Sequence, residues 1–270
     1  MANTHILLGT FQCGDKSKLI SVVRESIKCG IYGFDTAPSY KTEALLGLAL
    51  KKVCEELSIS REQLYISDKI DAWQMRAKNG DIRTYIEEAL KKLHTEYIDI
   101  MYVHWPVEEY IEKTWESLER CKADGLIRNT GICNVRVRHL QKWKSMGIVP
   151  KNIQIERHPL RTCKPEMDYC AANGITVFSY SPLGRMMTQI RESKVLQGLA
   201  SKYQKNIGQI ILRWQIDTNA CPVFTSTKPE RIKSNVDLLD FQLSESEIER
   251  IEALNINYKI FLESWGCPGF

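Results

Sequence analysis

The sequence predicts an α/β fold in which eight parallel strands, each followed by a helix, close into a single-domain (β/α)8 TIM barrel over residues 1–270. Short runs rich in β-branched and aromatic residues alternate with amphipathic stretches along the whole chain. The strand-like runs are apolar almost throughout, which is typical of parallel strands that are covered on both faces. No Gly-, Ser- or Pro-rich break divides the 270 residues, and barrels of this length commonly form one domain.

The expected strands and helices follow one another regularly. Strands are expected at residues 5–11, 32–37, 64–70, 97–105, 127–135, 152–159, 175–184 and 221–227. Helices are expected at residues 18–30, 43–57, 81–93, 110–125, 137–147, 165–174, 195–204, 207–216, 229–239 and 244–254. Two of these helices carry an apolar face that should pack against the sheet, formed by Ile82, Ile86, Leu90 and Leu93 and by Ile111, Trp115 and Leu118.

Helix-end signals agree with these boundaries. Four helices should end at glycines, which are Gly30, Gly125, Gly147 and Gly174. Ser244 with Glu247 forms a capping-box pattern that starts the last helix. A doubly wound open sheet is the alternative fold, and it is disfavoured because no G-x-G-x-x-G follows the first strand and no P-loop occurs.

Composition narrows the class of function. The formal charge of +4 is spread along the chain, so the sequence does not mark a nucleic-acid or membrane surface, and mild basicity suits an anionic small ligand. The nine cysteines form no C-x-x-C pair, which is typical of free thiols in a reducing compartment. The N-terminus does not resemble a leader, and no run is apolar over a membrane-spanning length. We therefore expect a cytoplasmic protein.

Polar residues gather where the expected strands end. In a barrel the carboxyl ends of the strands meet at one mouth. The polar residues there are Asp35, Tyr40, Lys69, His104, Asn134, Gln154, Glu156, Tyr180, Ser181 and Thr225 to Thr227. Each alone also fits a structural role, such as a helix cap, a solvated lysine or a buried histidine. An acid, a tyrosine, a lysine and a histidine on three neighbouring strands together favour a catalytic site.

These residue types suit proton transfer. A tyrosine that exchanges a proton near neutral pH must have its pKa lowered from about 10, and a nearby ammonium favours the phenolate. At about 4 Å and an effective dielectric near 20, the Lys69 ammonium would stabilise the Tyr40 phenolate by at most about 4 kcal/mol. Asp35 would keep the lysine charged, and His104 would donate a hydrogen bond to the substrate oxygen. We therefore expect Tyr40 to have a lowered pKa.

The segments "GFDTAPSY", "ISDKI" and "IDIMYVHWP" resemble motifs of the aldo-keto reductases, and the resemblance runs from "LLGTFQ" to "FQLSESEIERIEAL". The sequence is identified as a member of that family, of a short-loop, NADP-dependent type. The resemblance implies reversible NAD(P)H-dependent reduction of aldehyde or ketone groups of small molecules to alcohols. It assigns the general acid to Tyr40, with Asp35, Lys69 and His104 as its partners.

The resemblance also implies a cofactor site. "GICNV" and "NIQIERHP" place Asn134 and Gln154 at the nicotinamide carboxamide, with Cys133 where the family usually has serine. "FSYSPLGR" implies that Tyr180 stacks on the nicotinamide ring. It also implies that the pyrophosphate is lined by Ser181, Leu183, Gly184 and Arg185.

The loop "VFTSTKPERIKSNV" implies that Ser226 and Arg231 hold the adenosine 2′-phosphate and that Asn235 contacts adenine. NADP is the expected cofactor because Arg231 remains as a phosphate-binding group, and NAD is the alternative because Thr225 stands where the family has lysine. Lys228 or Lys233 would compensate for the missing lysine, or would be solvated surface charges.

Aromatic side chains should form the walls of the carbonyl pocket, namely Phe11, Trp73 and Trp105, with Trp265 or Phe270 from the tail. Asp71 stands where the family often has an apolar or aromatic residue, which favours polar or hydroxylated carbonyl substrates. The first strand starts almost at once and the tail after Leu254 is short, so trimmed loops are expected. By analogy with the family we expect a monomer or a weak homo-oligomer.

Two alternatives belong to other classes of function. One is a barrel that binds nicotinamide nucleotide as a regulatory or redox-sensing subunit with little turnover. The other is a metal-dependent isomerase that uses Asp35, His104, Glu156 and His158, although their order lacks metal-ligand spacing and no metal is expected.

Overall fold

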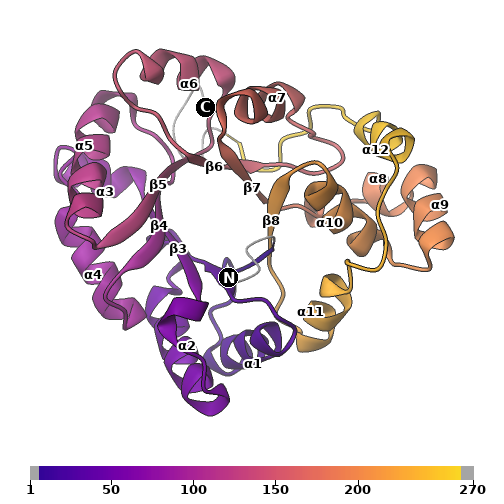
Figure 1. Ribbon diagram of the computed structural model, residues 1–270, viewed down its shortest axis with the longest axis horizontal. Coiled ribbons are helices and arrows are strands. Elements are labelled where there is room, and N and C mark those ends of the chain that lie inside the picture. The colour runs from indigo at the N-terminus through magenta and orange to yellow at the C-terminus, as the bar shows by residue number, and fades with distance from the viewer. Residues whose placement is uncertain (1–5, 263–270) are drawn as a thin grey trace.

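The structure is a computed structural model, and it describes residues 6–262. Its eight strands form one closed barrel in which every strand runs parallel to its neighbours in chain order (Figure 1). The strands are β1 (Leu7–Gly9), β2 (Gly33–Asp35), β3 (Tyr65–Ile70), β4 (Ile98–Val103), β5 (Ile127–Cys133), β6 (Asn152–Glu156), β7 (Thr176–Tyr180) and β8 (Ala220–Phe224). Leu7 of β1 pairs with Val223 of β8, which closes the ring, so the predicted barrel is confirmed and the open-sheet alternative is wrong.

The helices surround the strands (Figure 1). They are α1 (Lys16–Lys28), α2 (Glu43–Leu57), α3 (Ala72–Ala77), α4 (Arg83–Leu93), α5 (Ile111–Ala123), α6 (Val137–Lys144), α7 (Lys164–Asn173), α8 (Thr188–Arg191), α9 (Lys194–Tyr203), α10 (Ile207–Asp217), α11 (Pro229–Val236) and α12 (Glu245–Glu252). Short 3-10 turns are η1 (Pro38–Tyr40), η2 (Arg61–Gln63), η3 (Glu108–Tyr110) and η4 (Gly184–Met186). The sequence pattern did not predict α3 and α8, because helices of six and four residues are too short to show a period.

The predicted helix faces and ends are confirmed. Ile86, Leu90 and Leu93 of α4 are buried, and Ile82 is buried just before the helix. The Ser244 hydroxyl accepts a hydrogen bond from the Glu247 amide, and the Glu247 carboxylate accepts one from the Ser244 amide. The four predicted glycines all have positive φ, from 63° at Gly174 to 82° at Gly30. These local signals therefore act as the sequence indicates.

The interior of the barrel is filled by side chains below the mouth. This inner cluster consists of Leu7, Ile100, Tyr102, Cys133, Phe178 and Val223. A larger apolar layer lies between the strands and helices. The described cysteines are all free thiols, and Cys267 lies outside residues 6–262. Within the same residues, no helix combines the length and apolar character needed to cross a membrane.

The contact between α2 and α4 gives a test of this packing. A Cβ on Gly47 would lie 2.8 Å from the Leu93 Cα atom and would also overlap the Lys92 carbonyl. Gly47→Ala should therefore destabilise the fold by about 1–3 kcal/mol through overpacking, measured as a lower Tm in thermal unfolding. Gly198→Ala on α9 is the matched control, because its new Cβ meets no atom within 4 Å. The control should keep or raise Tm. An equal Tm for both variants would contradict the close α2–α4 contact.

Candidate active site

A cavity of about 720 Å³ opens at the carboxyl ends of the strands. Residues that follow β2, β3 and β4 line one side of it, including Tyr40, Asp71 and His104. Residues that follow β7 and β8 line the other side, including Leu183 and Thr225. The cavity therefore lies where the sequence places the polar strand ends.

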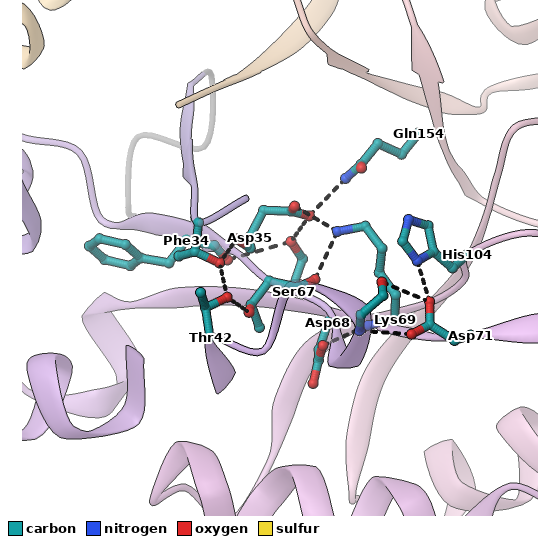
Figure 2. A network of polar contacts seen from close by, with 12 residues as sticks. Phe34, Asp35, Thr42, Ser67, Asp68, Lys69, Asp71, His104 and Gln154 are labelled. Atoms are coloured by element: carbon teal, nitrogen blue, oxygen red, sulfur yellow. Dashed lines mark hydrogen bonds and ion pairs between the residues drawn. The ribbon is translucent and has the colours of Figure 1, made fainter. Parts of the chain in front are cut away.

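A buried ion pair joins Lys69 to Asp35, a residue that lines this cavity (Figure 2). The Lys69 Nζ atom lies 2.6 Å from Asp35 Oδ2, and both side chains are almost completely buried. Lys69 also donates to the Thr36 carbonyl at 2.8 Å. The other Asp35 oxygen accepts from Ser67 Oγ at 2.7 Å and from Gln154 Nε2 at 2.8 Å. Hydrogen bonds that replace water make a buried pair of charges tolerable.

Tyr40 lies in η1, directly after β2, with its ring between three of the predicted side chains. The Lys69 Nζ atom is 4.9 Å from the centre of the Tyr40 ring. The His104 ring packs edge-on at 5.6 Å between centroids, and the Phe11 ring packs edge-on at 5.1 Å. The structure therefore brings together all four residues of the predicted catalytic set.

The predicted lowering of the Tyr40 pKa is wrong. Burial raises the pKa of Tyr40, Lys69 lowers it and Asp35 raises it, so the net direction is upward. The prediction failed because the Asp35 carboxylate offsets the ammonium charge and because the phenol is desolvated. Burial lowers the pKa of Lys69, but Asp35 and Tyr40 outweigh burial and the net pKa is raised. At neutral pH Lys69 is therefore charged and Tyr40 carries its proton, which is the form of a proton donor.

His104 pairs with Asp71. The Nδ1 atom of His104 lies 2.5 Å from Asp71 Oδ1 (Figure 2). Asp71 Oδ2 accepts from the Ser39 amide at 2.8 Å, and Oδ1 accepts from the Ser39 hydroxyl at 3.2 Å. The Asp71 carboxylate lines the cavity as expected, but Ser39 and His104 already use both of its oxygens.

The sequence patterns did not predict this pair, because the contact depends on strand register. Ile70 of β3 pairs with Val103 of β4, so the residues that follow them, Asp71 and His104, leave the barrel side by side.

The amides that the resemblance assigns to the nicotinamide have partners within the protein. Asn134 Nδ2 donates to the His104 carbonyl at 2.8 Å, and Asn134 Oδ1 accepts from the Tyr180 hydroxyl at 2.7 Å. Gln154 donates to Asp35, as described above. These contacts fix the orientation of all three side chains at the cavity wall, and Cys133 lies beside them.

The far side of the cavity contains part of the predicted phosphate site. It is lined by Ser181, Leu183, Arg185, Thr225 and Arg231. Three other predicted residues are not among the lining side chains that the structure describes: Gly184, Ser226 and Asn235. The Ser226 hydroxyl donates to the Lys228 carbonyl at 3.0 Å and accepts from the Lys228 amide at 3.1 Å, which fixes the turn before α11.

Gly184 packs closely against Ile190 and is not one of the residues that line the cavity. It has a φ of 52°, and a Cβ there would overlap Ile190. Lys228 and Lys233, the candidates for the missing cation, are both exposed.

The three predicted aromatic side chains, Phe11, Trp73 and Trp105, all line the cavity. Trp73 is 54% exposed and packs edge-on against Tyr85 at 5.4 Å. Trp265 and Phe270, the predicted tail contributions, lie outside the described residues. All three aromatic side chains expected for the carbonyl pocket are therefore present at the cavity.

Phe261 is a cavity residue that the sequence analysis missed. Its ring lies 6.1 Å from Phe11 and 5.6 Å from Tyr180, with the Arg185 guanidinium 4.7 Å from its centre. Glu156 holds the segment, because its two oxygens accept from the Ile260 and Phe261 amides at 2.8 Å each. No spacing rule links a strand to a tail 104 residues later, so the sequence contained no signal for this contact.

The residues of the metal-site alternative make other contacts. His158 Nε2 lies 3.3 Å from Glu156 Oε1, whereas Asp35 pairs with Lys69 and His104 with Asp71. Among residues 6–262, no three His, Cys, Asp or Glu side chains are grouped so that they could hold a metal ion.

A (β/α)8 barrel whose mouth brings a tyrosine next to a buried lysine–aspartate pair has an arrangement suited to proton exchange with a bound substrate. The model of the aldo/keto reductase family matches residues 5–256, and the chain belongs to this family. This confirms the predicted NAD(P)H-dependent reduction of aldehyde or ketone groups.

Named relatives are similar along nearly their full length. The glyoxal reductase of Bacillus subtilis (strain 168) is 34% identical over 254 residues, which cover 94% of this chain and 89% of the relative. The methylglyoxal reductase DkgA of Escherichia coli (strain K12) is 34% identical over 252 residues, covering 92% and 88%. The solved structure of the Bombyx mori aldo-keto reductase AKR2E4 in complex with NADP has a TM-score of 0.88 at 28% identity, covering 97% and 92%.

The contact between Glu156 and the tail can be tested by amide hydrogen exchange. Glu156→Gln keeps one oxygen acceptor and replaces the other with a donor, so one of the Ile260 and Phe261 amides loses its partner. Its exchange should quicken by about tenfold or more. Glu249→Gln, at an exposed carboxylate of α12, is the control and should leave both amides unchanged. Equal protection in the two variants would contradict the anchoring role.

Proposed function

We propose that this chain reduces the aldehyde group of small 2-oxoaldehydes to an alcohol, with NADPH as the preferred reductant. The observation that carries the proposal is the Tyr40 ring beside the buried Lys69–Asp35 pair at the mouth of the barrel. The substrate class is supported by the relatives named glyoxal reductase and methylglyoxal reductase. It also fits a mouth narrowed by the aromatic rings of Phe11, Trp105 and Phe261.

The side chains of the cavity suit a dinucleotide. The Tyr180 ring offers a flat, half-buried surface, and the Arg185 and Arg231 guanidiniums supply planar phosphate-binding groups. The helix α11 begins with Pro229 after an N-cap residue that makes no side-chain cap, so the Glu230 amide of its first turn can donate to an anion. When bound, the cofactor supplies the hydride at the nicotinamide C4 atom.

Each predicted cofactor residue has a proposed role on this basis. Asn134 and Gln154 would hold the carboxamide, and Tyr180 would pack on the nicotinamide ring. Arg231 would bind the 2′-phosphate of NADP, the cofactor with which the Bombyx mori relative was solved. The Ser226 hydroxyl would act by fixing the loop, because its hydrogen bonds already go to Lys228.

The protein supplies the proton. Tyr40 donates its phenolic proton to the carbonyl oxygen as the substrate is reduced, and Lys69 stabilises the phenolate that remains. Asp35 keeps Lys69 charged and fixed in place, since it accepts from the ammonium, Ser67 and Gln154. The aromatic side chains exclude water from the reacting oxygen.

Removing the Tyr40 hydroxyl tests the proton donor. Tyr40→Phe should lower kcat for methylglyoxal reduction by about 10²- to 10⁴-fold, because only the acid is lost. The Kd for NADPH, measured by tryptophan fluorescence quenching, should stay within about twofold since the ring remains. Tyr85→Phe, a tyrosine of α4 packed against Trp73, is the control and should keep kcat. Undiminished turnover in Tyr40→Phe would exclude this residue as the acid.

Thr225 tests cofactor preference. Thr225→Lys adds a cation on the cavity wall beside Arg231, so NADPH should bind about 5- to 10-fold more tightly while NADH is unchanged. Fluorescence titration with each nucleotide measures the ratio. Ser201→Lys is the control, because it adds the same charge at an exposed position of α9 that is not among the residues lining the cavity. If Thr225→Lys leaves the ratio of the NADH and NADPH Kd values unchanged, Thr225 does not lie near the 2′-phosphate.

A further inference from the structure

We propose that Asp71 is a positioning residue that keeps the proton of neutral His104 on Nδ1, so that Nε2 faces the cavity as a hydrogen-bond acceptor. His104 would then donate from Nε2 only as the imidazolium. The proposal deepens the proposed function, on which its catalytic consequence rests. The position of the proton itself does not depend on the substrate.

The contact between Asp71 and His104 contains a proton. Asp71 Oδ1 and His104 Nδ1 lie 2.5 Å apart, so a proton must lie between them. Burial raises the pKa of Asp71, but hydrogen bonds from His104 and Ser39 more than offset this and the net pKa is lowered. An ionised carboxylate can only accept, so the proton belongs to Nδ1.

Hydrogen bonds hold the Asp71 carboxylate in place. Ser39 binds it through both its amide and its hydroxyl, at 2.8 and 3.2 Å. The Asp71 amide donates to Gln74 Oε1 at 2.8 Å, which ties the residue to the start of α3. Ser39 therefore holds the carboxylate and Gln74 holds the backbone of Asp71, which keeps the acceptor against Nδ1. The neutral ring is thereby fixed in one tautomer.

The charge state of the His104 ring depends on burial and on its charged neighbours. Burial lowers the pKa of His104, Asp71 raises it, and Lys69 lowers it, with a net direction below the usual value. The titratable groups around the ring come from four neighbouring elements: Asp35 of β2, Tyr40 of η1, Lys69 of β3 and Cys133 of β5, in addition to Asp71. At neutral pH the ring therefore has one proton, and Asp71 holds it.

This reverses the expected role of His104 at neutral pH. From the sequence, His104 is expected to donate to the substrate oxygen, but a neutral ring with its proton on Nδ1 has no proton to donate at Nε2. Tyr40 then supplies the hydrogen bond to a plain aldehyde, and Nε2 is left to accept from a substrate hydroxyl. As pH falls through the His104 pKa, the imidazolium forms and a second donor appears.

The experiment begins with ¹⁵N-labelled wild-type protein without ligand. Long-range ¹H–¹⁵N correlation spectra at pH 8, assigned with His104→Gln, report which ring nitrogen carries the proton. The proposal requires a protonated Nδ1 and an unprotonated Nε2. In Asp71→Asn the carboxamide can donate to Nδ1, so the Nε2–H tautomer should become populated. A wild-type ring protonated at Nε2 would overturn the proposal, whether or not the variant folds.

Kinetics separate positioning from a structural role. For propanal, which has no hydroxyl, wild-type kcat/KM should rise about 3- to 10-fold between pH 8 and the plateau below the His104 pKa. Asp71→Asn should flatten this profile, because its neutral ring already donates from Nε2. Asp168→Asn, at an exposed carboxylate of α7, should keep the wild-type profile. A uniform loss of activity at every pH in Asp71→Asn would mean that Asp71 is only structural.

The two arms also distinguish failure of the inference from failure of the proposed function. If the protein has the Nδ1–H tautomer but reduces no aldehyde, the proposed function is wrong and the inferred position of the proton is still supported. An active reductase whose pH profile Asp71→Asn does not change would remove the catalytic part of the inference alone.

Discussion

The ion pair between Lys69 and Asp35 is the interaction on which the mouth of the barrel depends. Burying two charges costs several kcal/mol per ion, and only close contact together with further hydrogen bonds offsets that cost. Here the partners come from β2, β3 and β6, since Ser67 and Gln154 both donate to Asp35. The pair therefore joins three strands at one point and fixes an ammonium below the Tyr40 ring.

That ammonium acts differently on the two groups that exchange protons. Tyr40 keeps its proton because burial and Asp35 outweigh Lys69, yet the phenolate, once formed, lies beside a fixed positive charge. For His104 the same charge disfavours a second positive charge and lowers the pKa, whereas Asp71 raises it. A single lysine thus eases loss of the tyrosine proton and hinders gain of one by the histidine, which gives the two groups distinct roles in one cavity.

The sequence predicted what depends on local patterns. Apolar runs and helix-end residues predicted eight strands, and strand ends predicted the gathering of Asp35, Tyr40, Lys69 and His104. It could not predict properties that depend on how distant segments meet in the folded structure or on how opposing electrostatic effects add up there. The direction of the Tyr40 pKa depends on how far desolvation exceeds a paired charge. The Asp71–His104 contact needs strand register, α3 is too short to show a period, and the position of Phe261 depends on where the tail runs.

The strand β6 connects two of these features. Side chains two residues apart on a strand lie on the same face, so Gln154 and Glu156 both belong to the face that meets the cavity. Gln154 holds the Asp35 carboxylate, whereas Glu156 holds the backbone of the segment that carries Phe261. A shift of β6 would therefore move the support of the ion pair together with the aromatic ring that lies against Tyr180. Because β6 is hydrogen-bonded to β5 and β7 on its two sides, the barrel resists such a shift and keeps the proton donor and the tail in fixed relation.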